Sequence, residues 1–275
     1  MHAKHELVSI VVPIFNEEDG IEQLKQKLQR LKELLADEFE LEFVFVDDGS
    51  RDRTVERLKQ GFASSGFDFR VVEHGINRGV GAAMRTGFKY SRGSLVCTID
   101  ADCSYSPEGL KLLLDELLAK GSDIAVASPY HPRGGVEGVP AWRLALSKVC
   151  SSLYRLVSPV KLYTYTSVFR AYRAEVVNNI TFKADGFVSA AEILVAASRR
   201  GYEVIEVPMI LRGRAIGRSK MKVMRTIGTH LRMLSGLVVP SADASKEAHS
   251  TLAVEKLEES PISQRKLRMP PEAGV

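Results

Sequence analysis

Short apolar runs alternate with amphipathic segments along the first half of the chain. Each run is rich in β-branched residues and ends at a polar or proline-containing cluster, which is typical of a buried strand. The predicted strands cover residues 7–14, 41–46, 69–72, 94–99 and 123–128. Between them, apolar residues recur along one helical face, and the predicted helices cover residues 18–35, 54–62, 80–90 and 107–120. Strands that alternate with helices predict a mostly parallel sheet with helices on both faces.

The regular alternation ends beyond Pro129. The glycine-rich segment 134–138 indicates a flexible loop, and residues 169–173 predict a strand that leads into a short helix. Further helices are predicted at 142–157 and 187–200, and a last strand at 203–211. The expected organisation is a main α/β domain at 1–222, an amphipathic helix at 223–240, and a polar, disordered tail at 241–275.

The composition is that of an ordinary globular protein. Hydrophobic residues make up 45% of the chain and the formal net charge is only +4, so we expect a sizeable core rather than global disorder. The charge is unevenly distributed, because residues 199–232 contain nine Lys and Arg residues against two Glu residues. Such a segment suits phosphate groups or an anionic lipid surface, and a solvated basic face is the alternative.

Cysteine usage and apolar runs bear on the compartment. Cys97, Cys103 and Cys150 are odd in number and lack Cys-x-x-Cys spacing, which argues against a disulfide framework or a zinc site and favours a reducing cytosol. The N-terminus does not resemble a signal peptide, and no apolar stretch reaches the ~20 residues that span a bilayer. We therefore expect a cytoplasmic protein whose membrane contact is peripheral, at the cytoplasmic face, or made through a membrane partner.

Two carboxylates follow the predicted strand at 94–99, in Asp100-Ala101-Asp102. Residues i and i+2 of a strand face the same way, so both acids can converge on one ion at the strand end. Oxygen ligands suit Mg²⁺ or Mn²⁺. Such a metal would bridge the phosphates of a nucleotide sugar and neutralise charge on the leaving group. The alternative is a pair of loop acids that cap the next helix.

A second acidic cluster, Asp47-Asp48-Gly49-Ser50, follows the predicted strand at 41–46. A carboxylate there can bind a base or a ribose, because ligands of parallel sheets bind at the carboxyl ends of the strands. Asp-Gly-Ser also suits a turn followed by a helix cap. Both interpretations hold if Ser50 or Asp52 caps the helix while Asp48 binds.

A segment of small residues, Asn77 to Ala83, opens the predicted helix at 80–90. It lacks the full Gly-x-Gly-x-x-Gly order of a dinucleotide-binding loop, which disfavours an NAD oxidoreductase. We expect Gly81 and Ala83 to allow close helix packing, whereas Arg78 and Gly79 are candidates to approach a donor pyrophosphate.

Four ordered segments together resemble the signatures of family 2 glycosyltransferases: VSIVVPIFNE at 8–17, VDDGSRDRT at 46–54, NRGVGAAMRTG at 77–87 and IDADCSYSPE at 99–108. SPYHPRGG at 128–135, FRAYR at 169–173 and RAIGRSKMK at 214–222 are similar to the dolichyl-phosphate mannose synthase branch. The resemblance covers residues 7 to about 225. It implies a GT-A-type, Rossmann-like fold and transfer with inversion.

The resemblance assigns roles to the matching positions. The donor's base and ribose are assigned to Pro13, Phe15, Glu17, Val46 and Asp48, and its diphosphate to Asp100, Ala101 and Asp102. The implied metal ligands are Asp100 and Asp102, with Ser104 where the branch commonly has Gln. Arg214 and Lys220 match a basic loop that closes on the donor phosphates, so the expected catalytic set is Asp102, Arg214 and Lys220.

The acceptor's phosphate is assigned, again by resemblance, to Arg143 and Ser147. The branch often has Ser-Arg-Tyr where this chain has Ser128-Pro129-Tyr130, so one contact is missing unless Arg133 or His131 supplies it.

An acid in an apolar helix, Glu192, needs a partner. Pairing with Arg170, Arg173 or Lys220 would make it structural, and acceptor-side electrostatics is the functional alternative.

The expected reaction moves a hexose from a nucleotide sugar, GDP-mannose first and UDP-glucose second, to a polyprenyl phosphate. A phosphate oxygen is anionic near neutral pH, so no general base is needed. Two alternatives stay open: transfer to a sugar hydroxyl, with Glu192 or Asp185 as base, and a non-catalytic nucleotide-sugar-binding regulator.

The basic segment 214–239 predicts contact with a membrane surface or a helix packed on the catalytic domain. We expect no nucleic-acid partner.

Overall fold

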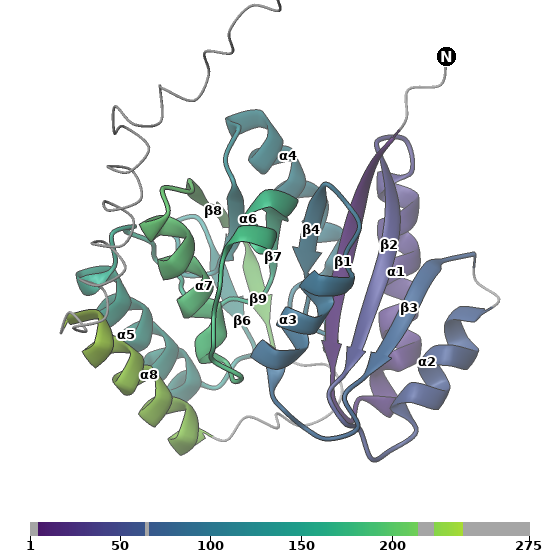
Figure 1. Ribbon diagram of the computed structural model, residues 1–275, viewed down its shortest axis with the longest axis horizontal. Coiled ribbons are helices and arrows are strands. Elements are labelled where there is room, and N and C mark those ends of the chain that lie inside the picture. The colour runs from purple at the N-terminus through teal and green to yellow at the C-terminus, as the bar shows by residue number, and fades with distance from the viewer. Residues whose placement is uncertain (1–4, 64–65, 214–222, 239–275) are drawn as a thin grey trace, which may run out of the picture. The chain divides into compact units, whose positions relative to one another are not determined.

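The computed structural model describes residues 5–63, 66–213 and 223–238 (Figure 1). Its main sheet has seven strands in the order β3-β2-β1-β4-β7-β5-β8, and only β7 runs antiparallel to its neighbours. The strands are β1 Glu6–Ile14, β2 Phe39–Asp47, β3 Asp68–Glu73, β4 Leu95–Thr98, β5 Ile124–Ser128, β7 Arg170–Arg173 and β8 Val204–Pro208. The predicted mostly parallel α/β sheet is therefore confirmed.

A second, two-stranded sheet corrects two predictions. Its strands are β6 Gly135–Glu137 and β9 Ile210–Arg212, so the predicted loop at 134–138 contains a strand and the predicted strand at 203–211 is two strands in different sheets. The pairing of β8 with β5 ends just after Pro208, where the Met209 N–H donates to the Ser128 carbonyl (3.3 Å). Met209 then accepts a hydrogen bond from the backbone N–H of Gly135 (3.1 Å). The apolar run continues across this change of sheet, so periodicity does not show it.

Helices cover both faces of the main sheet (Figure 1). Helices α1, α2 and α4 lie on one face, and α3, α6 and α7 lie on the other. The helices are α1 Ile21–Leu35, α2 Thr54–Ala63, α3 Val80–Tyr90, α4 Leu110–Lys120, α5 Ala141–Val157, α6 Ala174–Asn179, α7 Val188–Arg199 and α8 Val223–Val238. Short 3₁₀ turns, η1 Glu18–Gly20 and η2 Pro107–Gly109, precede α1 and α4. In the described part of the chain, no helix is long and apolar enough to cross a membrane.

The two faces of β1 bury different neighbours, as the alternation of side chains along a strand requires. Ile10 belongs to the core formed with the apolar stripe of α1, which includes Leu24 and Leu28. Val11 points to α3, where a Cβ added at Gly87 would collide with the Val11 side chain. Gly87 thus lets α3 lie close to the sheet, which brings the N-terminus of α3 to the strand ends.

A buried carboxylate on β2 links β1 to the segment that precedes β4. The Glu42 side chain is 1% exposed and accepts hydrogen bonds from Ser9 Oγ (2.5 Å) and from the backbone N–H (2.6 Å) and Nε (2.7 Å) of Arg92. Burial raises the pKa of Glu42, but the hydrogen bonds from Ser9 and Arg92 outweigh it and hold the pKa below its ordinary value. Glu42 is therefore charged in the folded protein near neutral pH.

We expect Glu42→Gln to lower the free energy of unfolding by about 1–3 kcal/mol at pH 7, because buried donors lose an ionic acceptor. A folded-state pKa below the unfolded value means that this contribution is complete above about pH 4.5 and is lost as the pH falls through the folded pKa. Urea unfolding at pH 7 and at decreasing pH measures both effects. Glu40→Gln on the exposed side of β2 is the matched control. A gap between wild type and Glu42→Gln that widens in acid would contradict the assignment.

Candidate active site

Loops that carry acidic residues meet at one edge of the main sheet. β1 pairs in parallel with β2 on one side and with β4 on the other, so the carboxyl ends of all three strands lie at the same edge. Asn16 and Glu17 follow β1, Asp48 follows β2, and Asp100 follows β4. Ligands of parallel α/β sheets bind at such an edge.

Asp48 anchors the segment 74–79. Its side chain is 5% exposed, and its carboxylate is close to His74 Nδ1 (2.8 Å) and accepts from Asn77 Nδ2 (2.9 Å) and the backbone N–H groups of Arg78 (2.9 Å) and Gly79 (2.7 Å). A carboxylate offers about four lone-pair positions, and these contacts use four. Asp48 therefore shapes the loop that begins α3. Any contact between Asp48 and a nucleotide-sugar donor has to compete with these four hydrogen-bonding contacts.

The neighbouring Asp47 has spare acceptor capacity. Its Oδ2 accepts from the backbone N–H groups of Gly49 (3.1 Å) and Ser50 (3.0 Å), while its buried Oδ1 has no hydrogen-bond partner among the described residues. Asp47 is not among the residues predicted to bind the donor; its place beside Asp48 in the acidic pair was the available signal. The predicted cap is confirmed for Asp52, whose Oδ1 accepts from the backbone N–H of Thr54 (3.0 Å) at the start of α2.

The other residues predicted to bind the nucleotide-sugar donor differ in the exposure of their side chains. Pro13, Phe15 and Glu17 are partly exposed at the end of β1, whereas the Val46 side chain is fully buried. Val46 therefore belongs to the core of the sheet rather than to its exposed edge.

Asp100 and Asp102 lie on a turn rather than on a strand. β4 ends at Thr98, Cys103 adopts the left-handed conformation (φ 54°), and its N–H donates to the Asp100 carbonyl (3.1 Å). Asp102 Oδ1 accepts from the backbone N–H of Ser104 (2.9 Å). The strand-alternation argument for their convergence is thus wrong in its detail, because the turn places both acids. Asp100, Asp102 and Ser104 nevertheless line one pocket of about 490 Å³.

The carboxylate and hydroxyl oxygens that line this pocket suit a hard divalent cation. The described residues contain no cluster of three or more His, Cys, Asp or Glu side chains that could hold a metal. Asp100 and Asp102 supply two carboxylates, and Ser104 adds a hydroxyl at the same pocket. Mg²⁺ is commonly bound by one or two carboxylates together with water and substrate phosphates. The set therefore suits a cation that arrives with a diphosphate.

Arg143 and Ser147 line the same pocket from the first two turns of α5. Ser147 Oγ lies 2.8 Å from Thr166 Oγ1, and the Arg143 guanidinium lies 5.2 Å from the centre of the Trp142 ring. The buried Nε of Arg143 has no hydrogen-bond partner among the described residues. The structure thus brings the predicted acceptor-phosphate residues to the acidic turn at 100–102, with an unused donor for an anion.

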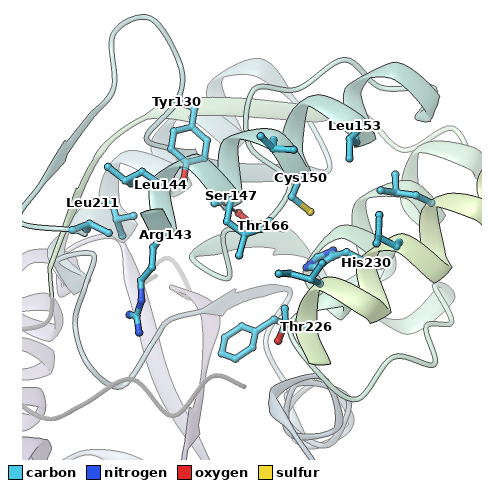
Figure 2. A pocket seen from close by; sticks show the side chains of 17 residues that line it. Tyr130, Arg143, Leu144, Ser147, Cys150, Leu153, Thr166, Leu211, Thr226 and His230 are labelled. Carbon is cyan, nitrogen blue, oxygen red and sulfur yellow. Dashed lines mark hydrogen bonds between the residues drawn. The ribbon is translucent and has the colours of Figure 1, made fainter. Parts of the chain in front are cut away.

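An apolar groove of about 290 Å³ between α5 and α8 continues from this pocket. Figure 2 shows Leu144, Ser147, Cys150 and Leu153 along α5 and Thr226 and His230 on α8. The two cavities share their lining at the junction: Tyr130, Val139, Arg143, Ser147, Thr166, Phe187 and Leu211. An amphiphile can therefore place its polar end at Arg143 and its apolar end between the helices.

The floor of the groove is uncharged near neutral pH. His230 is buried, and its Nδ1 lies 2.9 Å from the Tyr154 hydroxyl of α5. Burial lowers the pKa of His230 to about 4. This contact also shows that α8 packs on α5 through its residues up to Leu234, which is one of the two arrangements expected for that helix.

Several sequence-based expectations on the acceptor side need correction. Glu192 does not pair with Arg170 or Arg173 in the described structure; its carboxylate accepts from the backbone N–H groups of Lys183 (2.9 Å) and Ala184 (2.8 Å). Neither Arg133 nor His131 lines the pocket of Arg143. Tyr130 and Thr166 line it instead, and no local sequence pattern marks Thr166. Arg214 and Lys220 lie outside the described residues.

The segment at 77–83 serves close packing, as predicted for Gly81. A Cβ at Gly81 would collide with the carbonyl oxygen of Ala184, and the Gly81 N–H donates to the Asp185 carbonyl (2.7 Å).

Comparison with known proteins gives a consistent family match. The sequence model described as "Glycosyl transferase family 2" matches residues 9–181. The chain is 33% identical over 233 residues to the dolichol-phosphate mannosyltransferase of Pyrococcus furiosus, covering 84% of this chain and 63% of that protein. It is 31% identical over 218 residues to the polyprenol monophosphomannose synthase of Mycolicibacterium smegmatis, covering 77% of this chain and 80% of that protein. The chain thus spans less than two thirds of the Pyrococcus relative.

A solved structure shares the architecture. Glucosyl-3-phosphoglycerate synthase from Mycobacterium tuberculosis, solved with Mn²⁺, uridine diphosphate and glucosyl-3-phosphoglycerate, superposes with a TM-score of 0.61 at 20% identity, covering 86% of this chain and 82% of that chain. The likeness shows the GT-A fold.

We expect Asp48→Ala to lower the free energy of unfolding by about 3 kcal/mol, since four hydrogen-bonding groups of the 74–79 segment lose their acceptor. Urea unfolding at pH 7 measures the change. Asp37→Ala at an exposed site should stay within about 0.5 kcal/mol of wild type. Equal stability of the two variants would show that Asp48 does not anchor the loop.

Proposed function

Because the chain belongs to glycosyl transferase family 2, we propose that it transfers a hexose from a nucleotide-diphosphate sugar to a polyprenyl phosphate, with inversion at the anomeric carbon. The observation that carries this proposal is the junction at Arg143, where an acid-lined pocket and an apolar groove share a wall. A donor diphosphate and a lipid phosphate can meet there.

The shape and chemistry of the two cavities favour a lipid phosphate as acceptor. A polyprenyl phosphate combines an anionic head with a long apolar chain, and the junction offers the Arg143 guanidinium and the Ser147 hydroxyl next to an apolar groove. A sugar acceptor would place hydroxyl groups against a lining that is mostly apolar. The names of the Pyrococcus and Mycolicibacterium relatives state that those proteins act on dolichol phosphate and on a polyprenol.

The candidate bases for a hydroxyl acceptor are already engaged. Both carboxylate oxygens of Glu192 accept backbone hydrogen bonds, and the Asp185 carboxylate pairs with Arg85. A phosphate acceptor needs neither, because its oxygen is already anionic near neutral pH. The chain's task is then to hold the two substrates in line, which we assign to Arg143 and Ser147 on the acceptor side.

On the donor side, we assign the diphosphate to the pocket of Asp100, Ala101 and Asp102, and the base and ribose to the end of β1, at Pro13, Phe15 and Glu17. Asp100 and Asp102, with Ser104, would hold Mg²⁺ or Mn²⁺, which neutralises charge on a leaving nucleoside diphosphate. Arg214 and Lys220 are assigned to closure over the phosphates. GDP-mannose is the first choice of donor, since both relatives' names specify mannose, and UDP-glucose is the second.

We expect Arg143→Gln to raise the KM for polyprenyl phosphate by about 10- to 100-fold, because the phosphate loses one or two charge-assisted hydrogen bonds. The KM for the nucleotide-sugar donor should stay within about twofold of wild type. Initial rates of nucleoside diphosphate release, with each substrate varied in turn, measure this split. Arg143→Lys should recover part of the affinity, because the charge remains while the fork geometry is lost. A larger effect on the donor KM than on the acceptor KM would contradict the assignment.

We expect Asp102→Asn to reduce turnover by about 100-fold or more with the fold intact, because the pocket loses one of its two carboxylates. A panel of GDP-mannose and UDP-glucose, each with Mn²⁺ and either polyprenyl phosphate or sugar acceptors, identifies the substrates. Electron paramagnetic resonance of Mn²⁺ then reports metal binding by wild type and variant separately from turnover.

The panel also separates the alternatives. Product on a sugar hydroxyl alone would support a polysaccharide or glycolipid transferase. Metal and donor binding without product on any acceptor would support a non-catalytic regulator. Full turnover by Asp102→Asn would remove the metal assignment.

A further inference from the structure

An irregular segment forms one wall of the pocket that contains Asp100 and Arg143. Residues 162–168, between α5 and β7, belong to no helix or strand, and we call them the 162–168 segment. Four of its residues line the pocket: Thr164, Thr166, Ser167 and Val168. Buried backbone N–H groups outside regular structure need acceptors from elsewhere in the fold. The position of this wall therefore depends on the groups that accept its hydrogen bonds.

Glu206 of β8 holds two consecutive N–H groups of the 162–168 segment. Its Oε2 accepts from the backbone N–H of Tyr163 (2.7 Å), and its Oε1 accepts from the backbone N–H of Thr164 (2.9 Å) and from Ser128 Oγ (2.6 Å). Val126 of β5 pairs with Glu206, so Ser128, two residues further on, projects to the same face as Glu206. Glu206 itself does not line the pocket. It therefore acts on the pocket through the 162–168 segment.

Hydroxyl groups extend this anchor from Glu206 into the wall. Ser128 and Thr164 are both buried, and their hydroxyl oxygens lie 2.8 Å apart. A serine hydroxyl has a single hydrogen, and that of Ser128 is donated to Glu206, so the Thr164 hydroxyl is the donor in its contact with Ser128. The Glu206 carboxylate thereby fixes the backbone and the side chain of Thr164 together.

Two residues further along, Thr166 reaches the residues assigned to the acceptor's phosphate. Thr166 Oγ1 lies 2.8 Å from Ser147 Oγ, and Figure 2 shows these two side chains next to each other. Thr166, Ser147 and Arg143 all line both the pocket and the apolar groove. A shift of the 162–168 segment would therefore move the Thr166 hydroxyl at the junction of the two cavities.

We propose that Glu206 is a positioning residue for the acceptor's phosphate. It holds the 162–168 segment so that the Thr166 hydroxyl, beside Ser147, completes the set of donors that Arg143 begins. The inference rests on the proposed function, because it takes the acceptor's phosphate to bind at Arg143 and Ser147. It adds a contact from Thr166 and an anchor outside the pocket. Since a phosphate is held by several donors at fixed positions, a displaced hydroxyl weakens acceptor binding and leaves the donor side unchanged.

We expect Glu206→Gln to raise the KM for polyprenyl phosphate by about 5- to 10-fold and to leave the KM for the nucleotide-sugar donor within about twofold of wild type. The amide keeps the size of the side chain but replaces one acceptor oxygen with a nitrogen that cannot accept from Tyr163 or Thr164. Initial rates with each substrate varied in turn measure this split. Amide hydrogen exchange in the 162–168 segment should be faster in Glu206→Gln than in wild type.

Two further variants separate positioning from general stability. Ser128→Ala removes the hydroxyl between Glu206 and Thr164 without changing the lining of the pocket, and it should raise the KM for polyprenyl phosphate as well. Glu42→Gln weakens a buried carboxylate that bonds Ser9 and Arg92 instead. It should lower stability and leave the KM for both substrates as in wild type. Thermal unfolding of all three variants shows that the fold is kept.

Titration calorimetry with farnesyl phosphate, in the absence of a nucleotide sugar, tests the anchor separately from turnover. Weaker binding by Glu206→Gln in a protein without turnover would support the positioning role while the transferase function fails. Binding that Glu206→Gln leaves unchanged would remove the role of Glu206 alone. Equal effects of Glu206→Gln and Glu42→Gln on the acceptor KM would also overturn it, as would a parallel rise of both KM values. No binding by wild type would remove the lipid phosphate acceptor and this role of Glu206 with it.

Discussion

The parallel pairing of β1 with both β2 and β4 is the constraint on which the site depends. It brings three loops to one edge of the sheet, although their residues lie far apart along the chain. The pairing is held from both ends. Apolar side chains on the two faces of β1 pack against α1 and α3. Away from the acidic loops, the Glu42 carboxylate of β2 links Ser9 with Arg92.

Carboxylates have two distinct functions in this molecule. Asp48, Glu42 and Glu192 accept several hydrogen bonds from nearby donors and thereby fix loops. Asp100 and Asp102 instead line an open pocket on a turn at the end of β4. Carboxylate oxygens that line an open pocket suit a hard divalent cation that arrives with a diphosphate.

A single path connects the surface with the acidic turn. The apolar groove between α5 and α8 reaches Arg143 and Ser147, and these residues also line the pocket of Asp100 and Asp102. An acceptor with a lipid chain and a phosphate head matches this arrangement, because its chain fits the apolar groove and its phosphate fits the junction at Arg143 and Ser147.

The sequence by itself determined most helices and strands of the main sheet, the family and the location of the acidic clusters, because hydrophobic periodicity and short motifs are local properties. It also offered Asp52, as an alternative to Ser50, for the helix cap, and it placed Gly81 in close packing. Only the tertiary structure decided that the chain changes sheets after Pro208, that Asp48 and Glu192 are occupied by backbone donors, and that α8 meets α5 through His230 and Tyr154. Each of these depends on contacts between residues distant in sequence, whose partners no local pattern specifies.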